Sequence, residues 1–381
     1  MKPVKKLFDS VRPHFEKGGK LSRFYYTFEA FESFAFVPPR VTQTGSHIRD
    51  AIDMKRTMIF VVIALLPAAL FGMWNIGYQH FLALGQESTL VANFWYGFLK
   101  WLPLQVVVFA VGMTIEFIFA DIRKHEVAEG FIVSAFLIPL ILPPDIPLWM
   151  VALATAFAVL IGKEAFGGSG MNIFNPALLA RVFLFFAYPA HISGDKVWIS
   201  GLPDAMSGAT PLGLAAAGDI SLMPSAIDRF LGFIPGSIGE TSTLAILLGA
   251  AFLLITGIAS YRIMFSVFAG GFLMALVFNL WGANAYMQIP PWEQLIMGGF
   301  AFGAVFMATD PVSAAQTNTG KWIYGLLIGM FAVLIRVFNP AYPEGIMMAI
   351  LLMNVFAPLI DHYVVQANIK RRLKRASVTA K

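Results

Sequence analysis

The sequence contains no cysteine among its 381 residues. Without cysteine the chain forms no disulfides, has no thiolate nucleophile, and supplies no thiolate ligands to zinc or to an iron–sulfur cluster. Histidine is also scarce. There are six, none in the middle of a long apolar stretch, so we expect no pair of axial haem ligands at one membrane depth. Any redox chemistry of this chain would therefore depend on an organic cofactor.

Charged residues are scarce as well, at 13% of the sequence, whereas 58% of the residues are apolar. A water-soluble domain usually carries about a quarter of its residues as charges, and a disordered chain is far less apolar. Both classes are excluded. The sequence has no Gly-x-Gly-x-x-Gly or Walker motif opening a helix after a strand, so nucleotide binding by this chain is not expected.

Apolar stretches recur along the chain at lengths close to the roughly 20 residues that a helix needs to cross a bilayer. The first begins near residue 57, behind a polar and basic segment that does not resemble a cleavable signal sequence. We expect an all-α polytopic membrane protein with about ten transmembrane helices, the third and eighth of them short. The expected spans are 57–77, 101–120, 128–142, 147–165, 172–188, 241–260, 263–282, 295–309, 322–338 and 345–362.

The positions of lysine and arginine predict the orientation, because cytoplasmic loops near span ends retain these residues. With the N-terminus inside, 22 of the 27 fall in inner segments, against two, Lys196 and Arg229, in outer ones. The positive charge is then a topology signal, and no nucleic-acid partner is expected. The predicted divisions are a cytoplasmic N-terminal segment (1–56), a first five-helix repeat (57–188), a periplasmic loop (189–240), a second five-helix repeat (241–362) and a basic cytoplasmic tail (363–381).

The two halves share short motifs in the same order, and an odd number of spans separates the copies, so the second copy is inverted in the membrane. Gly130-Phe131, Pro144-Asp145, Gly162-Lys163 and Asn175-Pro176 are matched by Gly299-Phe300, Asp310-Pro311, Gly320-Lys321 and Asn339-Pro340. Inverted repeats with interrupted helices place binding sites near the bilayer midplane. The Asn-Pro pairs are also ordinary helix starts, and the pattern fits a channel or carrier as well as an enzyme.

The long outer loop contains the stretch DAMSGATPL at residues 204–212. Interpreted locally, Thr210 is a helix N-cap, Pro211 is the first helical residue, and Gly218 ends a short apolar turn. The stretch also resembles the Asp-x-x-Ser/Thr-Gly-Ala/Ser-Thr acceptor, on whose threonine a flavin transferase esterifies FMN through its phosphate. The residues that match this acceptor are Asp204, Ser207, Gly208, Ala209 and Thr210.

Beyond this stretch the chain resembles, nearly end to end, the B subunit of the bacterial Na+-translocating NADH:quinone oxidoreductases. The resemblance includes residues 46–50 (SHIRD), 161–181 (IGKEAFGGSGMNIFNPALLAR), 308–313 (ATDPVS) and 336–345 (RVFNPAYPEG). The related D subunit of Rnf complexes shares the flavin motif but lacks the N-terminal extension present here. The resemblance implies a component of the bacterial inner membrane that works with the A, C, D, E and F subunits of a sodium pump.

The resemblance implies two flavins. FMN would be attached covalently to Thr210, where a helix N-terminus presents free amides that suit a phosphate. The loop faces outward by the charge pattern, which is the side on which the family's flavin transferase acts. A non-covalent riboflavin would lie between the spans at Asn172 and Asn175, whose amides can hydrogen-bond an isoalloxazine edge. The alternative for these two asparagines is capping of the fifth span.

Glu116 lies within the second span, four residues after Gly112. A carboxylate in a span is costly and normally faces a partner or a water-filled site. The resemblance places this pair in the region of the quinone substrate, ubiquinone or menaquinone, although the family often has a second glycine where this chain has Met113. The alternative is a glutamate at the lipid interface near Arg123 and Lys124.

Asp361 and Glu29 match acids that the resemblance links to sodium uptake or release. Sodium is a hard cation and prefers oxygen ligands, as other hard cations do. The alternative for Asp361 is a helix end paired with His362 or Lys370, and for Glu29 a solvated helix face.

The resemblance therefore implies a redox subunit. Electrons from an NADH-oxidising partner would reach FMN on Thr210, pass to riboflavin and reduce quinone, coupled to the export of Na+. An Rnf-type D subunit is one alternative. The other is a non-redox channel or carrier of urea-transporter-like fold, which would need no flavin.

Overall fold

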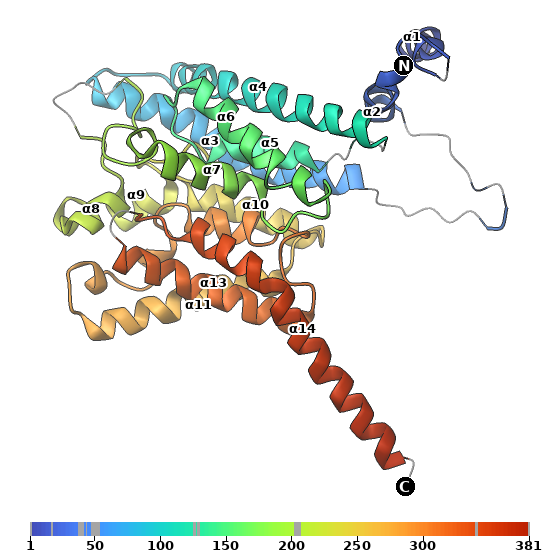
Figure 1. The fold of residues 1–381 in the computed structure, drawn as a ribbon. Coiled ribbons are helices and arrows are strands. Elements are labelled where there is room, and N and C mark those ends of the chain that lie inside the picture. The colour runs from blue at the N-terminus through green and yellow to red at the C-terminus, as the bar shows by residue number, and fades with distance from the viewer. Residues whose placement is uncertain are drawn as a thin grey trace.

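The computed structural model describes residues 2–16, 18–36, 42, 44–46, 54–124, 127, 130–201, 207–339 and 342–379, and these residues form helices and turns without a strand. Figure 1 shows a bundle of roughly aligned helices from which α1, α2 and the end of α14 project. The helices are α1 (Lys2–Phe15), α2 (Tyr25–Ala35), α3 (Met54–Ala83), α4 (Leu90–Arg123), α5 (Phe131–Leu140), α6 (Leu148–Leu160), α7 (Pro176–Ala187), α8 (Pro211–Ala217), α9 (Ala226–Leu231), α10 (Thr243–Ile255), α11 (Tyr261–Trp281), α12 (Phe300–Phe302), α13 (Asn318–Phe338) and α14 (Ile346–Thr379).

Six helical segments within the described residues are long and apolar enough to cross a membrane. They are Thr57–Ala83, Leu90–Arg123, Leu148–Phe166, Tyr261–Trp281, Asn318–Phe338 and Ile346–Arg375. Each coincides with one of the expected spans. The prediction of an all-helical polytopic membrane protein is confirmed.

The other four expected spans fold as shorter apolar helices. Helices α5, α7 and α10 have 10, 12 and 13 residues, and the eighth span folds as α12 followed by a π-helical turn over Gly303–Met307. At about 1.5 Å per residue none of these crosses a hydrocarbon core of about 30 Å alone. The third and eighth spans were expected to be short. The fifth and sixth are shorter than expected, because Asn175 caps α7 directly before Pro176 and Gly257, at φ 71°, follows the end of α10.

Helix packing follows a similar order in the two halves. In the first half, α4 packs against α3, α5 and α6, and α6 packs against α7. In the second, α11 packs against α13 and the π-helical turn, and α13 packs against α14. The halves meet where α3 packs on α10 and where α7 packs on α14. The predicted inverted repeat stays a prediction, and one of its motif pairs is not equivalent in the structure. Gly162-Lys163 follows the end of α6, whereas Gly320-Lys321 lies in the first turn of α13.

Close helix contacts use small residues, as in other membrane bundles. A Cβ atom on Gly270 of α11 would lie 2.1 Å from the carbonyl oxygen of Leu326, and one on Gly329 of α13 would lie 2.0 Å from that of Val267. The backbones of α11 and α13 therefore approach more closely than any side chain at these two positions would permit.

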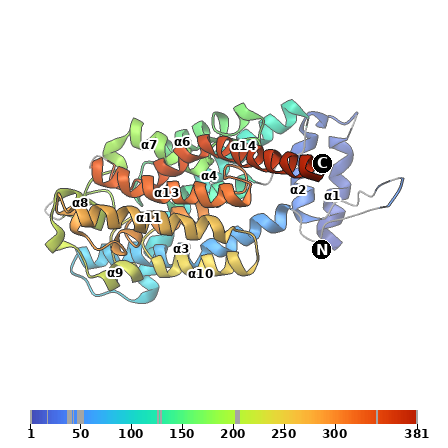
Figure 2. The same ribbon diagram turned by 90° about the horizontal axis from the view of Figure 1, so that it is seen from below.

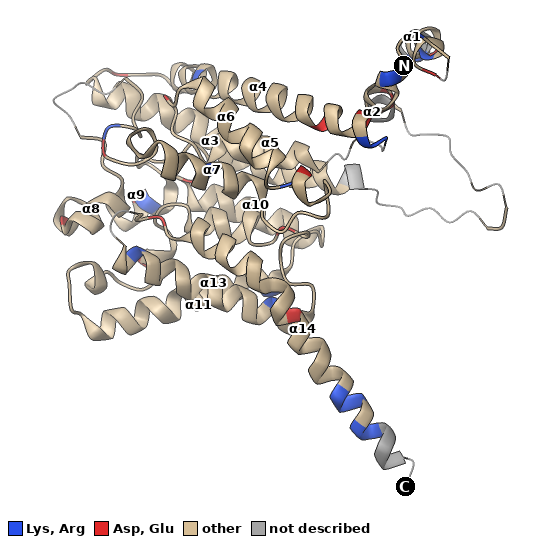
Figure 3. Ribbon diagram, in the orientation of Figure 1, with Lys and Arg blue, Asp and Glu red and all other residues tan. Residues whose placement is uncertain are grey.

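The two described ends of the chain lie at the same end of the bundle, and α8 and α9 lie at the opposite end (Figure 1). The view from below shows the same separation, with α1, α2 and the last part of α14 at one end of the bundle and α8 and α9 at the other (Figure 2). Lysine and arginine gather on α1, on the turn between α1 and α2 and on the last part of α14 (Figure 3). Helix α14 continues without a break from Ile346 to Thr379, so the basic tail expected from residue 363 extends the last span as a helix.

Candidate functional site

Thr210 is the N-cap of α8, as its local sequence predicts. Its side-chain oxygen accepts a hydrogen bond of 3.1 Å from the backbone N–H of Gly213. Pro211 is the first helical residue, and Gly218 ends the helix in a left-handed conformation at φ 87°. Leu212 is buried beneath the helix and holds the short turn against the rest of the protein. The cap thus fixes the position of the Thr210 hydroxyl.

Thr210 also lines the wall of a cavity of about 530 Å³ at the end of the bundle opposite the chain termini. The cavity volume falls within the range of about 300–1,000 Å³ that is usual for small-molecule sites. Its walls come from several separate parts of the sequence. They are α7, the loop before and around Thr210, the turn that precedes α10, the turn at Gly298 and the turn between α13 and α14.

The residues that precede Thr210 are held by Asp195 on the opposite side of the loop. The Ser207 hydroxyl donates to the Asp195 carboxylate at 3.2 Å, and the Gly208 N–H donates to the Asp195 carbonyl at 2.8 Å. Ser207 and Ala209 line the cavity with Thr210, whereas Gly208 is buried. Asp204, the first residue of the predicted motif, lies outside the described residues.

Buried charge forms the inner wall of this cavity. Arg181 of α7 is 2% exposed and makes an ion pair of 2.6 Å with Glu344, which lies in the turn before α14. Arg181 also donates to the Ser237 hydroxyl at 3.1 Å, and its guanidinium lies 5.6 Å from the centre of the Trp198 ring. These residues join the first repeat, the outer loop and the second repeat at one point.

Glu240 adds a second buried carboxylate to the same wall. Burial and repulsion from Glu344 raise the pKa of Glu240 to about 8, against the opposing attraction of Arg181. Burial, together with Glu344, also raises the pKa of Tyr342. Buried polar groups normally have partners. Here several cavity-lining side-chain atoms make no hydrogen bond within the described part of the chain, namely Arg181 Nε, Glu240 Oε1, Thr241 Oγ1, Tyr342 OH and Glu344 Oε2.

No sequence motif predicted a role for Arg181, Arg336, Glu240 or Glu344. Two arginines within apolar spans were the available signal, because charges in a membrane are rare and usually functional. Arg336 donates to the backbone carbonyls of Gln294, Met297 and Glu344 at 2.6, 2.9 and 2.8 Å. Arg336 therefore connects the turn before α14 to the segment of residues 294–297.

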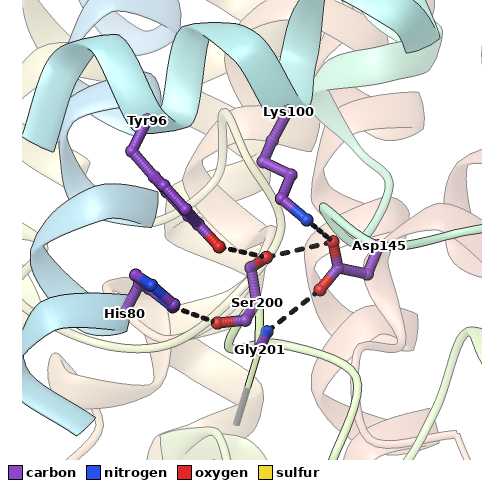
Figure 4. Close-up of polar contacts among 6 residues, drawn as sticks. All are labelled: His80, Tyr96, Lys100, Asp145, Ser200 and Gly201. Carbon is purple, nitrogen blue, oxygen red and sulfur yellow. Dashed lines mark hydrogen bonds and ion pairs between the residues drawn. The ribbon is translucent and has the colours of Figure 1, made fainter. Parts of the chain in front are cut away.

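A second polar cluster anchors the outer loop upstream of the motif (Figure 4). Asp145 accepts hydrogen bonds from Lys100 at 2.7 Å, from the Ser200 hydroxyl at 3.0 Å and from the Gly201 N–H at 3.2 Å. Burial opposes the ionisation of Asp145, but these hydrogen bonds outweigh it and lower its pKa. His80 and Tyr96 bind the Ser200 carbonyl and hydroxyl at 2.7 and 3.0 Å. The loop is thus fastened to α3 and α4.

Asn172 and Asn175 line a separate pocket of about 140 Å³ between the two halves, the inner pocket. Asn175 accepts from the N–H groups of Ala177 and Leu178 at 2.9 and 3.4 Å, so it caps α7 as the alternative interpretation predicted. The Asn172 amide donates to the Phe174 carbonyl at 2.8 Å. Capping and pocket lining occur together at Asn175.

Glu116 lies deep in the protein and pairs with Lys163, which also lines the inner pocket. The pair is almost completely buried, with side chains 4% and 3% exposed. Glu116 does not lie at a lipid interface beside Arg123, because its side chain is buried against Lys163, and Arg123 binds Glu164 at 2.9 Å. This arrangement depends on the turn after α6, which brings Lys163 and Glu164 beneath α4.

Gly112 lies one turn before Glu116 and faces the ring of Phe131. A Cβ atom at this position would lie 1.8 Å from Phe131 Cζ. The space that the missing side chain leaves is therefore filled by an aromatic ring of α5 in this structure.

Asp361 accepts three hydrogen bonds at the start of α13. The donors are the Gln316 N–H at 2.6 Å, the Thr317 N–H at 3.0 Å and the Thr317 hydroxyl at 2.5 Å. The expected alternative, a pair with His362 or Lys370, is not the arrangement in the structure. Gln316 in turn donates to the Pro311 carbonyl at 2.7 Å, so Asp361 is linked to the edge of the inner pocket.

Glu29 lies on α2, which packs against α4. The contact includes a hydrogen bond of 2.7 Å from Thr27 to Asp121 and the rings of Phe31 and Phe117, whose centroids are 5.4 Å apart. Glu29 is partly buried and does not lie on a fully solvated helix face. The structure therefore forms two groups of predicted residues: one around Thr210 at the end of the bundle opposite the chain termini, and one around Asn172, Glu116 and Asp361.

Comparisons with known proteins agree on the family. Residues 41–370 match the model of the NQR2, RnfD, RnfE family. The chain is 52% identical to the B subunit of the Na(+)-translocating NADH-quinone reductase of Ectopseudomonas mendocina, with 98% of this chain and 99% of that protein covered. It is 51% identical to the corresponding protein of Chromohalobacter salexigens, with 98% and 96% covered. The chain therefore belongs to the NQR2, RnfD, RnfE family of membrane proteins.

Proposed function

We propose that this chain is the B subunit of a Na+-translocating NADH:quinone reductase and carries FMN as a phosphoester on Thr210. The relatives that share about half of its residues over nearly the whole chain bear that subunit name. The observation that carries the FMN proposal is the position of Thr210. Its hydroxyl is held by the helix cap at the wall of a cavity large enough for a flavin.

The residues that line the Thr210 cavity fit a flavin nucleotide. A covalently attached phosphate would lie beside the first turn of α8, and the planar Arg181 guanidinium, which lines the same cavity, suits contact with an aromatic ring system. When bound, a flavin supplies a carrier for one or two electrons, and the protein supplies its position and polarity. The Asp195 hydrogen bonds and the Asp145 cluster hold the loop on which the attachment site stands.

We propose that riboflavin contacts Asn172 and Asn175 at the inner pocket. At about 140 Å³ it is smaller than usual ligand sites, so the pocket as it stands receives a ring edge and not a whole isoalloxazine. The asparagine amides can donate to and accept from such an edge.

We also propose positions for the quinone and for Na+. Gly112 and Glu116 would face a ubiquinone or menaquinone head group at α4, where movement of the Phe131 ring would open the space. Asp361 and Glu29 would attract Na+ near the end of the bundle that carries both described chain ends, with carboxylate oxygens as ligands.

We further propose the orientation and the partners. The basic ends of the chain would be cytoplasmic and the Thr210 loop periplasmic, because the lysines and arginines gather at one end of the bundle (Figure 3). The membrane would be the bacterial inner membrane, and the A, C, D, E and F subunits would complete the complex. The five divisions 1–56, 57–188, 189–240, 241–362 and 363–381 are part of this proposal.

The test is to make the full chain in a host with and without the flavin transferase, and to examine it on a denaturing gel under ultraviolet light. A fluorescent band is expected only with the transferase. Mass spectrometry of the peptide with residues 204–214 should find the added FMN on Thr210, and Thr210→Ala should insert normally but stay dark. A dark wild-type band from the transferase host would overturn the proposal and favour the carrier.

A further inference from the structure

The inner wall of the Thr210 cavity holds more buried charge than packing requires. Two carboxylates and a tyrosine, Glu240, Glu344 and Tyr342, lie there with Arg181. Each has one buried polar atom that makes no hydrogen bond within the described residues. An unpaired buried polar atom costs free energy. Four such atoms at one cavity indicate a site whose hydrogen bonds and charges are completed by a ligand or a proton.

The two arginines do not pair equally with the two carboxylates of the cluster. Arg181 gives its strongest contact to Glu344, at 2.6 Å, and Arg336 gives its three donors to backbone carbonyls. Glu240 receives no ion pair from either arginine within the described residues, and its carboxylate lies against the backbone of Gly299. Of the two acids, Glu240 is therefore the one whose charge is poorly compensated.

We propose that Glu240 is a proton-binding site whose occupancy is linked to the redox state of the flavin at Thr210. The inference rests on the function proposed above. Reduction of a flavin attached at Thr210 would add negative charge to the cavity. Where Glu240 is ionised with the flavin oxidised, above about pH 8, its carboxylate would bind a proton from the aqueous phase on reduction and release it on reoxidation.

The surroundings of Glu240 set the pH range of this exchange. The charged and titratable groups that face it are Glu344, Arg181, Arg336 and Tyr342, and the Ser237 hydroxyl lies beside it. With the flavin oxidised, burial and Glu344 raise the pKa of Glu240 to about 8. A negative charge on the flavin raises it further, because like charges at short range disfavour ionisation.

The consequence is a potential that depends on pH on the alkaline side. Below about pH 8 the carboxyl is protonated in both redox states, so it contributes no dependence. Above that value the oxidised form ionises while the reduced form keeps its proton. The midpoint potential of the Thr210 flavin should then fall by up to about 59 mV per pH unit, which is the tenfold change in proton concentration expressed for one electron.

The experiment is a spectroelectrochemical titration of the full chain, made with the flavin transferase, between pH 6 and 10, with about half-unit steps. Subtracting the same titration of Thr210→Ala isolates the flavin at Thr210 from any non-covalent flavin. In Glu240→Gln, which keeps the shape of the side chain but cannot ionise, the alkaline fall contributed by Glu240 should be lost. The matched control is Glu87→Gln, which removes an exposed carboxylate in the loop between α3 and α4 and should keep the wild-type profile.

Fluorescence of the denatured band reports covalent flavin in each variant, so the failure of the two proposals is distinguishable. A dark wild-type band contradicts the proposed function. A fluorescent Glu240→Gln band with a wild-type pH profile overturns the proton site alone. If Glu240→Gln does not fold, Glu240→Asp replaces it. That variant should move the alkaline break in the profile, and an unmoved break overturns the proposal.

Discussion

Replacing Glu116 with glutamine should destabilise the protein strongly, because the change leaves a buried lysine without its counter-charge. The side chains of Lys163 and Glu116 are 3% and 4% exposed, so water cannot substitute for the lost carboxylate. Breaking a buried ion pair from one side costs about 3–5 kcal/mol. The Phe131 ring lies 5.7 Å from the Lys163 ammonium, but this cation–π contact is present in the wild type as well, so it does not reduce the difference. We expect a loss of about 3–5 kcal/mol.

Removing both charges should recover most of that loss. In Glu116→Gln combined with Lys163→Met, no buried charge is left uncompensated, and such replacements are often neutral. The assay is reversible unfolding of the full chain in mixed micelles of increasing SDS content, followed by the fluorescence of its eight tryptophans. The double variant should lie within about 1 kcal/mol of the wild type.

The matched control is Lys100→Met, which breaks an ion pair at the other end of the bundle. The side chains of Lys100 and Asp145 are 36% and 41% exposed, and exposed pairs contribute about 0–1 kcal/mol. If Glu116→Gln costs no more than Lys100→Met, the reasoning from burial is refuted.

Three further changes test local features. Asp361→Ala removes three hydrogen bonds at the start of α13, including that from Thr317, and should lower the free energy of unfolding by about 2 kcal/mol; a wild-type value in the same assay would contradict this. Gly112→Ala drives a methyl group into the Phe131 ring and should cost about 1–3 kcal/mol, which Phe131→Leu in the same chain should partly restore. Asp145 has a lowered pKa, so its contribution is present above its usual pKa and is lost as the pH falls through the lowered value. Asp145→Asn should therefore lose less stability on acidification than the wild type, and an equal loss would count against the cluster.

Local sequence predicted well where neighbouring residues alone decide the structure. Thr210 caps α8, Pro211 begins it and Gly218 ends it, because capping involves groups within one helical turn. The apolar stretches likewise located the membrane helices. Hydropathy alone did not predict that α7 and α10 are short, since a cap at Asn175 or a left-handed Gly257 interrupts a helix without interrupting the apolar composition.

Partners distant in the sequence were not predicted. The alternative that paired Glu116 with nearby positive charges failed because the turn after α6 brings Lys163, 47 positions away, into contact with it. Asp361 binds residues 44 and 45 positions away and not its neighbours on α14. An apolar pattern predicts that a carboxylate within a span needs a partner, but it does not identify the partner residue.

The sequence by itself determined the membrane class of this protein, its helical character and the capped turn at Thr210, because each depends on composition or on groups a few residues apart. Only the tertiary structure decided that Thr210 faces a cavity walled by Arg181, Glu240 and Glu344. These three residues come from the end of one repeat, from the outer loop and from the turn before the last helix. Packing of the two halves against each other brings their charges together, and no local pattern contains that information.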